Sequence, residues 1–109
     1  MVKKISKEQV EEFELLESQL GHAYQEMKDL SKKTPKDNLN VLKINVINRM
    51  LERIKSLLVN EPTNDFLDLL KDDVTLPNVS DAVLIISQYI AAMEQFKQKY
   101  TTYTGDWMC

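Results

Sequence analysis

Four polar side chains have the chemistry of a small-ligand site. Asn45, Asn48 and Arg49 fall close together in the middle of the chain, and Tyr89 falls near its end. Amide, guanidinium and phenol groups can hold a small polar molecule between two helices through hydrogen bonds. Asparagines that face inward from helices more often fix the register of packing. We therefore take helix packing as the first interpretation and a pocket made by these four residues as the alternative.

The residues that could bind a metal or a nucleotide are too few or wrongly spaced. The chain has one histidine, His22, and one cysteine, Cys109, which is too few for a usual Cys/His zinc site. A helical carboxylate site would place a glutamate three residues before His22, where the sequence has Gln19. Neither glycine belongs to a Gly-x-Gly or Gly-Lys-Ser/Thr loop. We expect no metal and no cofactor.

The sequence also lacks motifs that would indicate catalysis. No Gly-x-Ser-x-Gly segment exists to present a serine nucleophile. The acidic group at residues 65, 68, 72 and 73 lacks the glycine and the alternating ligand spacing of a calcium loop. We therefore expect a protein that is not an enzyme and that has no catalytic residues.

Charge is distributed unevenly along a chain whose formal net charge is −3. An acidic first third is followed by a basic group, and residues 61–81 are acidic again; the basic group is Lys36, Lys43, Arg49, Arg53 and Lys55. So few positive charges on an acidic protein are weak against a phosphate backbone, so nucleic-acid binding is disfavoured. We expect the basic side chains to pair with the acidic faces of the first helix and of residues 61–81.

The last ten residues carry four contact-prone side chains, Tyr100, Tyr103, Trp107 and Met108. Aromatic side chains left in water usually cover an apolar patch or contact a partner. Two interpretations stay open: the tail docks on its own bundle or on a second copy, or it is a recognition segment for another protein. In the second case these four residues would be the partner-binding residues.

The elements that position these residues are predicted to be helices. Ser6 followed by Gln9 is a capping box, which predicts a helix over residues 7–32. Its apolar residues recur every three or four positions, as one helical stripe does: Val10, Phe13, Leu16, Leu20, Tyr24, Met27 and Leu30. Gly21 lies within this predicted helix, and we interpret it as the site of a close helix crossing.

Thr34 as the N-cap and Pro35 at the first position predict a second helix over residues 35–59. Its apolar residues are wider than one stripe, so we expect it to be the central helix, with contacts on two sides. Its β-branched residues leave a buried strand as an alternative. Thr63 is a possible N-cap and predicts a short helix over 64–70. We expect a loop to follow, anchored by Val74, Leu76 and Val79. Ser80 is the predicted N-cap of a last helix over 80–100. Residues 101–109 form a tail.

Composition agrees with this assignment. The chain has 109 residues, is 43% hydrophobic and has only 2 glycines and 3 prolines, which is typical of one helical domain. No apolar run approaches the ~20 residues that cross a bilayer. A lone cysteine offers no intrachain disulfide. We expect a cytoplasmic, all-α protein with three long helices and one short helix, joined by short connections into an antiparallel, up-down-up bundle.

Three long helices expose more apolar surface than they can cover if the second and third are apolar on more than one side. We therefore expect a homodimer that hides the excess. The function that fits best is a small protein-interaction or regulatory module, of the adaptor, inhibitor or immunity-protein type, with a protein partner. The alternative is a small-ligand or nucleotide sensor with a pocket between helices.

Overall fold

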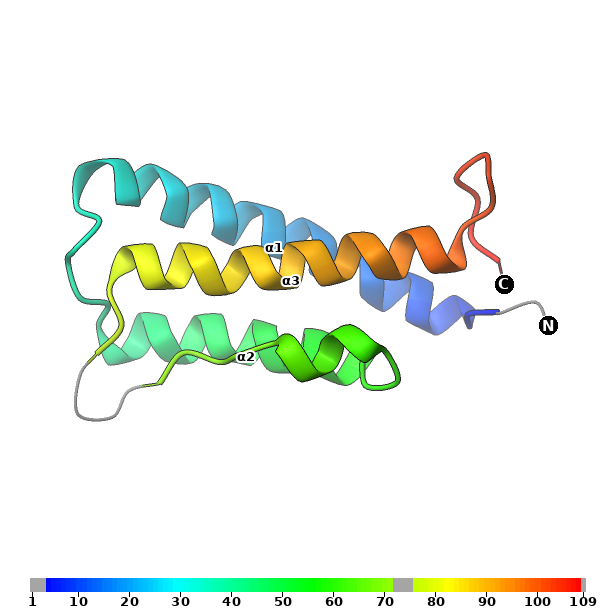
Figure 1. Cartoon of the computed structure of the whole chain (residues 1–109), viewed down its shortest axis with the longest axis horizontal. Coiled ribbons are helices and arrows are strands. Elements are labelled where there is room, and N and C mark those ends of the chain that lie inside the picture. The colour runs from blue at the N-terminus through cyan, green and yellow to red at the C-terminus, as the bar shows by residue number, and fades with distance from the viewer. Residues whose placement is uncertain (1–3, 72–75, 109) are drawn as a thin grey trace.

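The chain folds into three α-helices joined by extended and turn segments, as the computed structural model shows for residues 4–71 and 76–108 (Figure 1). The elements are α1 (Lys7–Lys33), α2 (Val41–Leu57), a 3-10 helix η1 (Pro62–Phe66) and α3 (Val79–Tyr100). The molecule measures 47 × 25 × 19 Å. No helix in the described ranges has the length and apolar character that crossing a membrane requires. The predicted mostly helical class is confirmed.

Helix α1 forms as its sequence predicts. The Ser6 hydroxyl accepts from the Gln9 backbone N–H, and the Gln9 side chain accepts from the Ser6 N–H, so the capping box is present. The predicted stripe faces inward: five of its residues are buried and Tyr24 and Leu30 are half-buried. α1 packs most extensively against α3. The core therefore lies mainly between these two helices, with Phe13, Leu16, Ile86 and Tyr89 fully buried.

The helix directions differ from an up-down-up bundle. α1 runs opposite to both α2 and α3, whereas α2 and α3 run the same way (Figure 1). The Leu39 N–H donates to the Pro77 carbonyl just before α2 and α3 begin. At the other end, Lys99 pairs with Glu61 just after α2. The long connection from α2 to α3 returns beside α2, which is why these two helices need not be antiparallel.

The start of the second helix was predicted wrongly. Thr34 caps the end of α1, and its N–H donates to the Leu30 carbonyl. Residues 37–39 are then held beside residues 77–79 by backbone hydrogen bonds and a bridge between Asn38 and Asn78. This pairing keeps the backbone extended, so α2 begins at Val41, with Asn40 as its N-cap. Within Val41–Leu57 the helix is confirmed over the alternative strand.

The predicted helix over 64–70 is also wrong. A short 3-10 helix covers Pro62–Phe66, Thr63 makes no cap, and residues 67–71 are extended. The last helix begins at Val79 because Asn78, not Ser80, forms a capping box with Asp81. Of the predicted loop anchors, Val79 is buried and Leu76 is half-buried, and Val74 lies outside the described residues.

Gly21 does not mark a close helix crossing. It lies on the exposed side of α1, and a Cβ added to it would meet nothing within 4 Å. We therefore expect Gly21→Ala to raise the free energy of unfolding by about 0.5–1 kcal/mol, because alanine restricts the unfolded chain and favours the helix. Urea denaturation measures this change. An unchanged or lowered stability would mean that Gly21 has a contact the structure does not show.

Candidate functional site

Two of the predicted ligand-site residues bind the protein's own chain. The Asn48 side chain donates to the Leu70 carbonyl at 2.7 Å and accepts from the Leu70 N–H at 2.9 Å. The Tyr89 hydroxyl donates to the Asp68 carbonyl at 2.7 Å. The asparagine amide has both a donor and an acceptor, so it can make the two backbone hydrogen bonds that a neighbouring β-strand would make. Asn48 and Tyr89 thus hold the extended segment 67–71 against α2 and α3.

Other side chains complete the attachment of this segment. Lys55 donates to the Leu67 carbonyl at 2.9 Å, and Gln88 accepts from the Asp68 N–H at 3.2 Å. Two side chains of the segment itself, Leu67 and Leu70, are buried in the core. Burial, and then the nearby carboxylates of Asp68 and Glu52, raise the pKa of Tyr89 well above its ordinary value. The hydroxyl therefore stays protonated and keeps donating to the segment.

The four predicted ligand-site residues do not converge. Asn45 is exposed on α2, and Arg49 is exposed on a side of α2 that faces α1. Asn48 and Tyr89 both reach segment 67–71, which belongs to the chain itself. The first interpretation of the asparagines, that those facing inward fix packing, therefore holds for Asn48.

Removing the Asn48 amide tests this role. Asn48→Ala leaves both backbone groups of Leu70 without their partner in a half-buried place, so we expect it to lower the free energy of unfolding by about 1–3 kcal/mol. Asn45→Ala is the matched control, one turn away and exposed, and should change stability by no more than about 0.5 kcal/mol. Chemical denaturation compares the two. Equal effects would contradict the structural role of Asn48.

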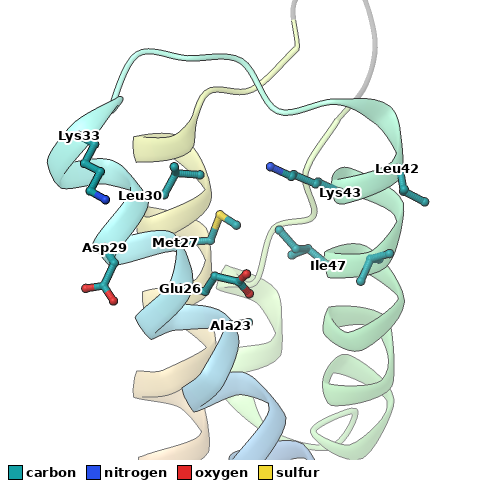
Figure 2. Close-up of a pocket in the computed structure, with 10 residues that line it drawn as sticks. Ala23, Glu26, Met27, Asp29, Leu30, Lys33, Leu42, Lys43 and Ile47 are labelled. Carbon is teal, nitrogen blue, oxygen red and sulfur yellow. The ribbon is translucent and has the colours of Figure 1, made fainter.

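A surface groove of about 520 Å³ lies between α1 and α2 (Figure 2). Met27 and Leu30 of α1, and Lys43 and Ile47 of α2, point into the space between the helices. Met27 and Ile47 are buried and form the apolar base of the groove. We call this feature, lined by the C-terminal half of α1 and the N-terminal half of α2, the α1–α2 groove.

The outer edge of α2 along this groove is apolar and exposed. Leu42 and Val46, four residues apart and therefore on one side of the helix, are 71% and 52% exposed. The buried stripe of α2 lies on another side and consists of Ile44, Ile47, Leu51 and Ile54. The second apolar side predicted for this helix exists, but the described part of the chain leaves it uncovered. The prediction that this helix is the central one, with contacts on two sides, is therefore wrong: α1 is the helix that packs extensively against both others.

The two walls of the groove carry opposite charge. Glu26 and Asp29 lie on the α1 wall, where Lys33 stands at the end of the helix, and Lys43 lies on the α2 wall. The groove continues along both helices, where Arg49 and Arg53 extend the basic wall. Arg53 also pairs with Glu12 of α1, which confirms part of the predicted pairing between the basic group and the first helix. In residues 4–71 and 76–108, no ion pair involves Glu26, Lys43 or Arg49.

The C-terminal tail docks on its own chain. Thr101 and Trp107 form a bridge around a turn, where Gly105 has a φ of 92° that favours glycine. The rings of Trp107 and Phe13 form a T-shaped contact, with centroids 5.0 Å apart. The Met108 carbonyl accepts from the Ile5 N–H at 2.9 Å, which joins the two ends of the chain.

The tyrosines of this region differ in their surroundings. Tyr100 lies against Phe96, and its hydroxyl donates to Glu61 at 3.1 Å. Tyr103, at the tip of the turn, is fully exposed. The interpretation in which the tail docks across the bundle therefore describes Tyr100, Trp107 and Met108. Partner binding by the four tail residues stays a prediction.

No group of three or more metal-ligating side chains gathers within the described ranges. His22 is exposed and lines the continuation of the groove beside Arg49. Comparisons with protein-family models, curated proteins and solved structures found no match for this chain.

Sequence reasoning did not select Leu42 and Val46 as site residues. The signal was present, because their spacing of four residues sets them on a different side of α2 from the stripe Ile44, Ile47, Leu51 and Ile54. The missing information was which neighbour this side would meet. That depends on how α2 packs against α1, which places this side at the edge of the groove instead of in the core.

Proposed function

We propose that this chain is a protein-interaction module that binds an amphipathic helix along the α1–α2 groove. The observation that carries the proposal is the exposed pair Leu42 and Val46 beside an apolar groove base made by Met27 and Ile47. Helix-binding grooves take anchors spaced three or four residues apart, which matches the spacing of the residues on these walls. The chain then acts as an adaptor, inhibitor or regulatory subunit and performs no catalysis.

The charges of the walls define the partner. Its helix carries an apolar stripe with basic residues on the edge that meets Glu26 and Asp29, and acidic residues on the edge that meets Lys43 and Arg49. Such exposed charges contribute more to orientation and association rate than to affinity. Of the four contact-prone tail residues, Tyr103 is the one that is exposed and could make an additional contact.

A variant pair tests this function. Leu42→Asp with Val46→Asp places charge at the edge of the groove, whereas Leu84→Asp alters an equally exposed leucine on α3, 64% exposed. We expect the groove variant to lose at least about tenfold in affinity for its partner, because apolar anchors at the centre of an interface dominate binding. The control should bind like the wild type, and the folded structure of both should persist because the changed side chains are exposed.

The measurement is quantitative affinity capture from cells that make the protein, with wild type, groove variant and Leu84→Asp in parallel. The expected result is a protein, either another chain or a second copy of this one, that the wild type and the control retain and the groove variant loses. Identical capture by all three, or loss with Leu84→Asp alone, would overturn the proposed groove.

A further inference from the structure

We infer that the helix that enters the α1–α2 groove is α2 of a second copy of this chain, so that two copies form a symmetric dimer with each exposed edge of α2 in the groove of the other. This inference rests on the proposed function, since it names the occupant of the same groove. A second copy is a sufficient partner because its α2 offers an exposed apolar edge together with charged side chains that complement the groove walls.

The apolar part of the match comes from one helix edge. Leu42 and Val46 project beside the groove and do not fill it within their own chain, since they remain 71% and 52% exposed. Met27, Leu30 and Ile47 line the groove that a second copy would offer. A two-fold axis beside the groove therefore places the apolar edge of each copy against the apolar base of the other.

The charged part of the match comes from the two walls. The α2 edge that enters the groove brings Lys43 and Arg49, and it meets Glu26 and Asp29 on the α1 wall. In a two-fold dimer every contact occurs twice, so the α1 wall of each copy faces the α2 wall of the other. Both sets of contacts are attractive, because the two carboxylates of the α1 wall outnumber its one amine, that of Lys33, whereas the α2 wall is basic.

Charge reversal tests this arrangement. Variant A carries Glu26→Lys and Asp29→Lys, which makes both walls basic. Variant B carries Lys43→Glu and Arg49→Glu, which makes both walls acidic. The fourfold variant carries all four changes, so that its walls exchange charge while its net charge stays that of the wild type. A second control, Glu14→Lys with Glu94→Lys, repeats the charge change of variant A at exposed positions away from the groove lining.

Sedimentation equilibrium at low salt measures the mass of each protein and of mixtures, and circular dichroism verifies that each is folded. We expect a dimer for the wild type, the fourfold variant and the Glu14/Glu94 control. Variants A and B alone should each dimerise at least tenfold more weakly, because like charges face one another. A mixture of A and B should recover the dimer, since both of its wall pairs are again of opposite charge.

Three results would overturn the inference: a monomeric wild type from micromolar to millimolar concentration, variants A and B that dimerise as well as the wild type, or a fourfold variant that stays monomeric. A monomer that still captures another protein, with capture lost on Leu42→Asp and Val46→Asp, would remove the second copy as occupant and leave the proposed function standing. A monomer with no groove-dependent partner would contradict both.

Discussion

Replacing Phe13 with alanine is expected to lower the free energy of unfolding by about 3–5 kcal/mol, because a fully buried aromatic ring is lost and a cavity remains. Phe13 stacks on Phe96 of α3 with centroids 5.5 Å apart, and it makes a T-shaped contact with Trp107 of the tail. One side chain therefore joins α1, α3 and the C-terminal tail. The change should be read by chemical denaturation.

Leu15→Ala is the matched control for Phe13→Ala. It lies two residues along the same helix, is about half exposed, and should change stability by about 0.5 kcal/mol or less. If both substitutions had similar small effects, the contact between α1 and α3 would not be the main core of the protein.

Trp107→Ala is expected to lower the free energy of unfolding by about 2–3 kcal/mol. Its ring is half-buried against Phe13, so its loss should be smaller than that of a fully buried aromatic side chain. Met108 directly follows Trp107 in the chain. The same substitution should therefore break the hydrogen bond between the Ile5 N–H and the Met108 carbonyl. Thermal and urea denaturation measure the loss of stability, and amide exchange at Ile5 reports the loss of the contact.

Tyr103→Ala is the control for the tail, because it alters an aromatic residue of the same turn that contacts only solvent at its tip. We expect it to leave stability within about 0.5 kcal/mol of the wild type. A large effect of Tyr103→Ala together with a small effect of Trp107→Ala would mean that the tail is attached in a different way.

Local signals in the sequence were sufficient for the parts of the fold that local interactions determine. The capping box of Ser6 and Gln9 and the stripe beginning at Val10 predict α1 to within one residue of its observed end. The same applies to α3, whose start was displaced by one residue because Asn78 caps it in place of Ser80. In both helices the decisive contacts span no more than four residues.

Long-range contacts explain the parts that the sequence did not predict. Asn48 and Leu70 are 22 residues apart, and no local pattern indicates that a helix amide will hold an extended segment. Likewise, Thr34 and Pro35 resemble a helix start, yet the pairing of Asn38 with Asn78 keeps this region extended. The parallel order of α2 and α3 follows from these contacts and could not be predicted from helix spacing.

The groove was predicted only in part. The excess of apolar residues on the second helix indicated that one of its sides would stay uncovered. The exposed residues Leu42 and Val46 lie on that side. Its position between the acidic wall of α1 and the basic wall of α2 depends on the tertiary fold, and the proposed choice of partner rests on this position.

The most direct test of the central claim, that the chain binds a helix in the α1–α2 groove, is site-specific photo-crosslinking in cells. A photoreactive amino acid replaces Val46 at the groove edge, or Leu84 on α3 as the control. The claim predicts one defined adduct from Val46, whose mass identifies another protein or a second copy of this chain, and none from Leu84. Adducts from Leu84 with none from Val46, or no adduct at either position, would contradict it.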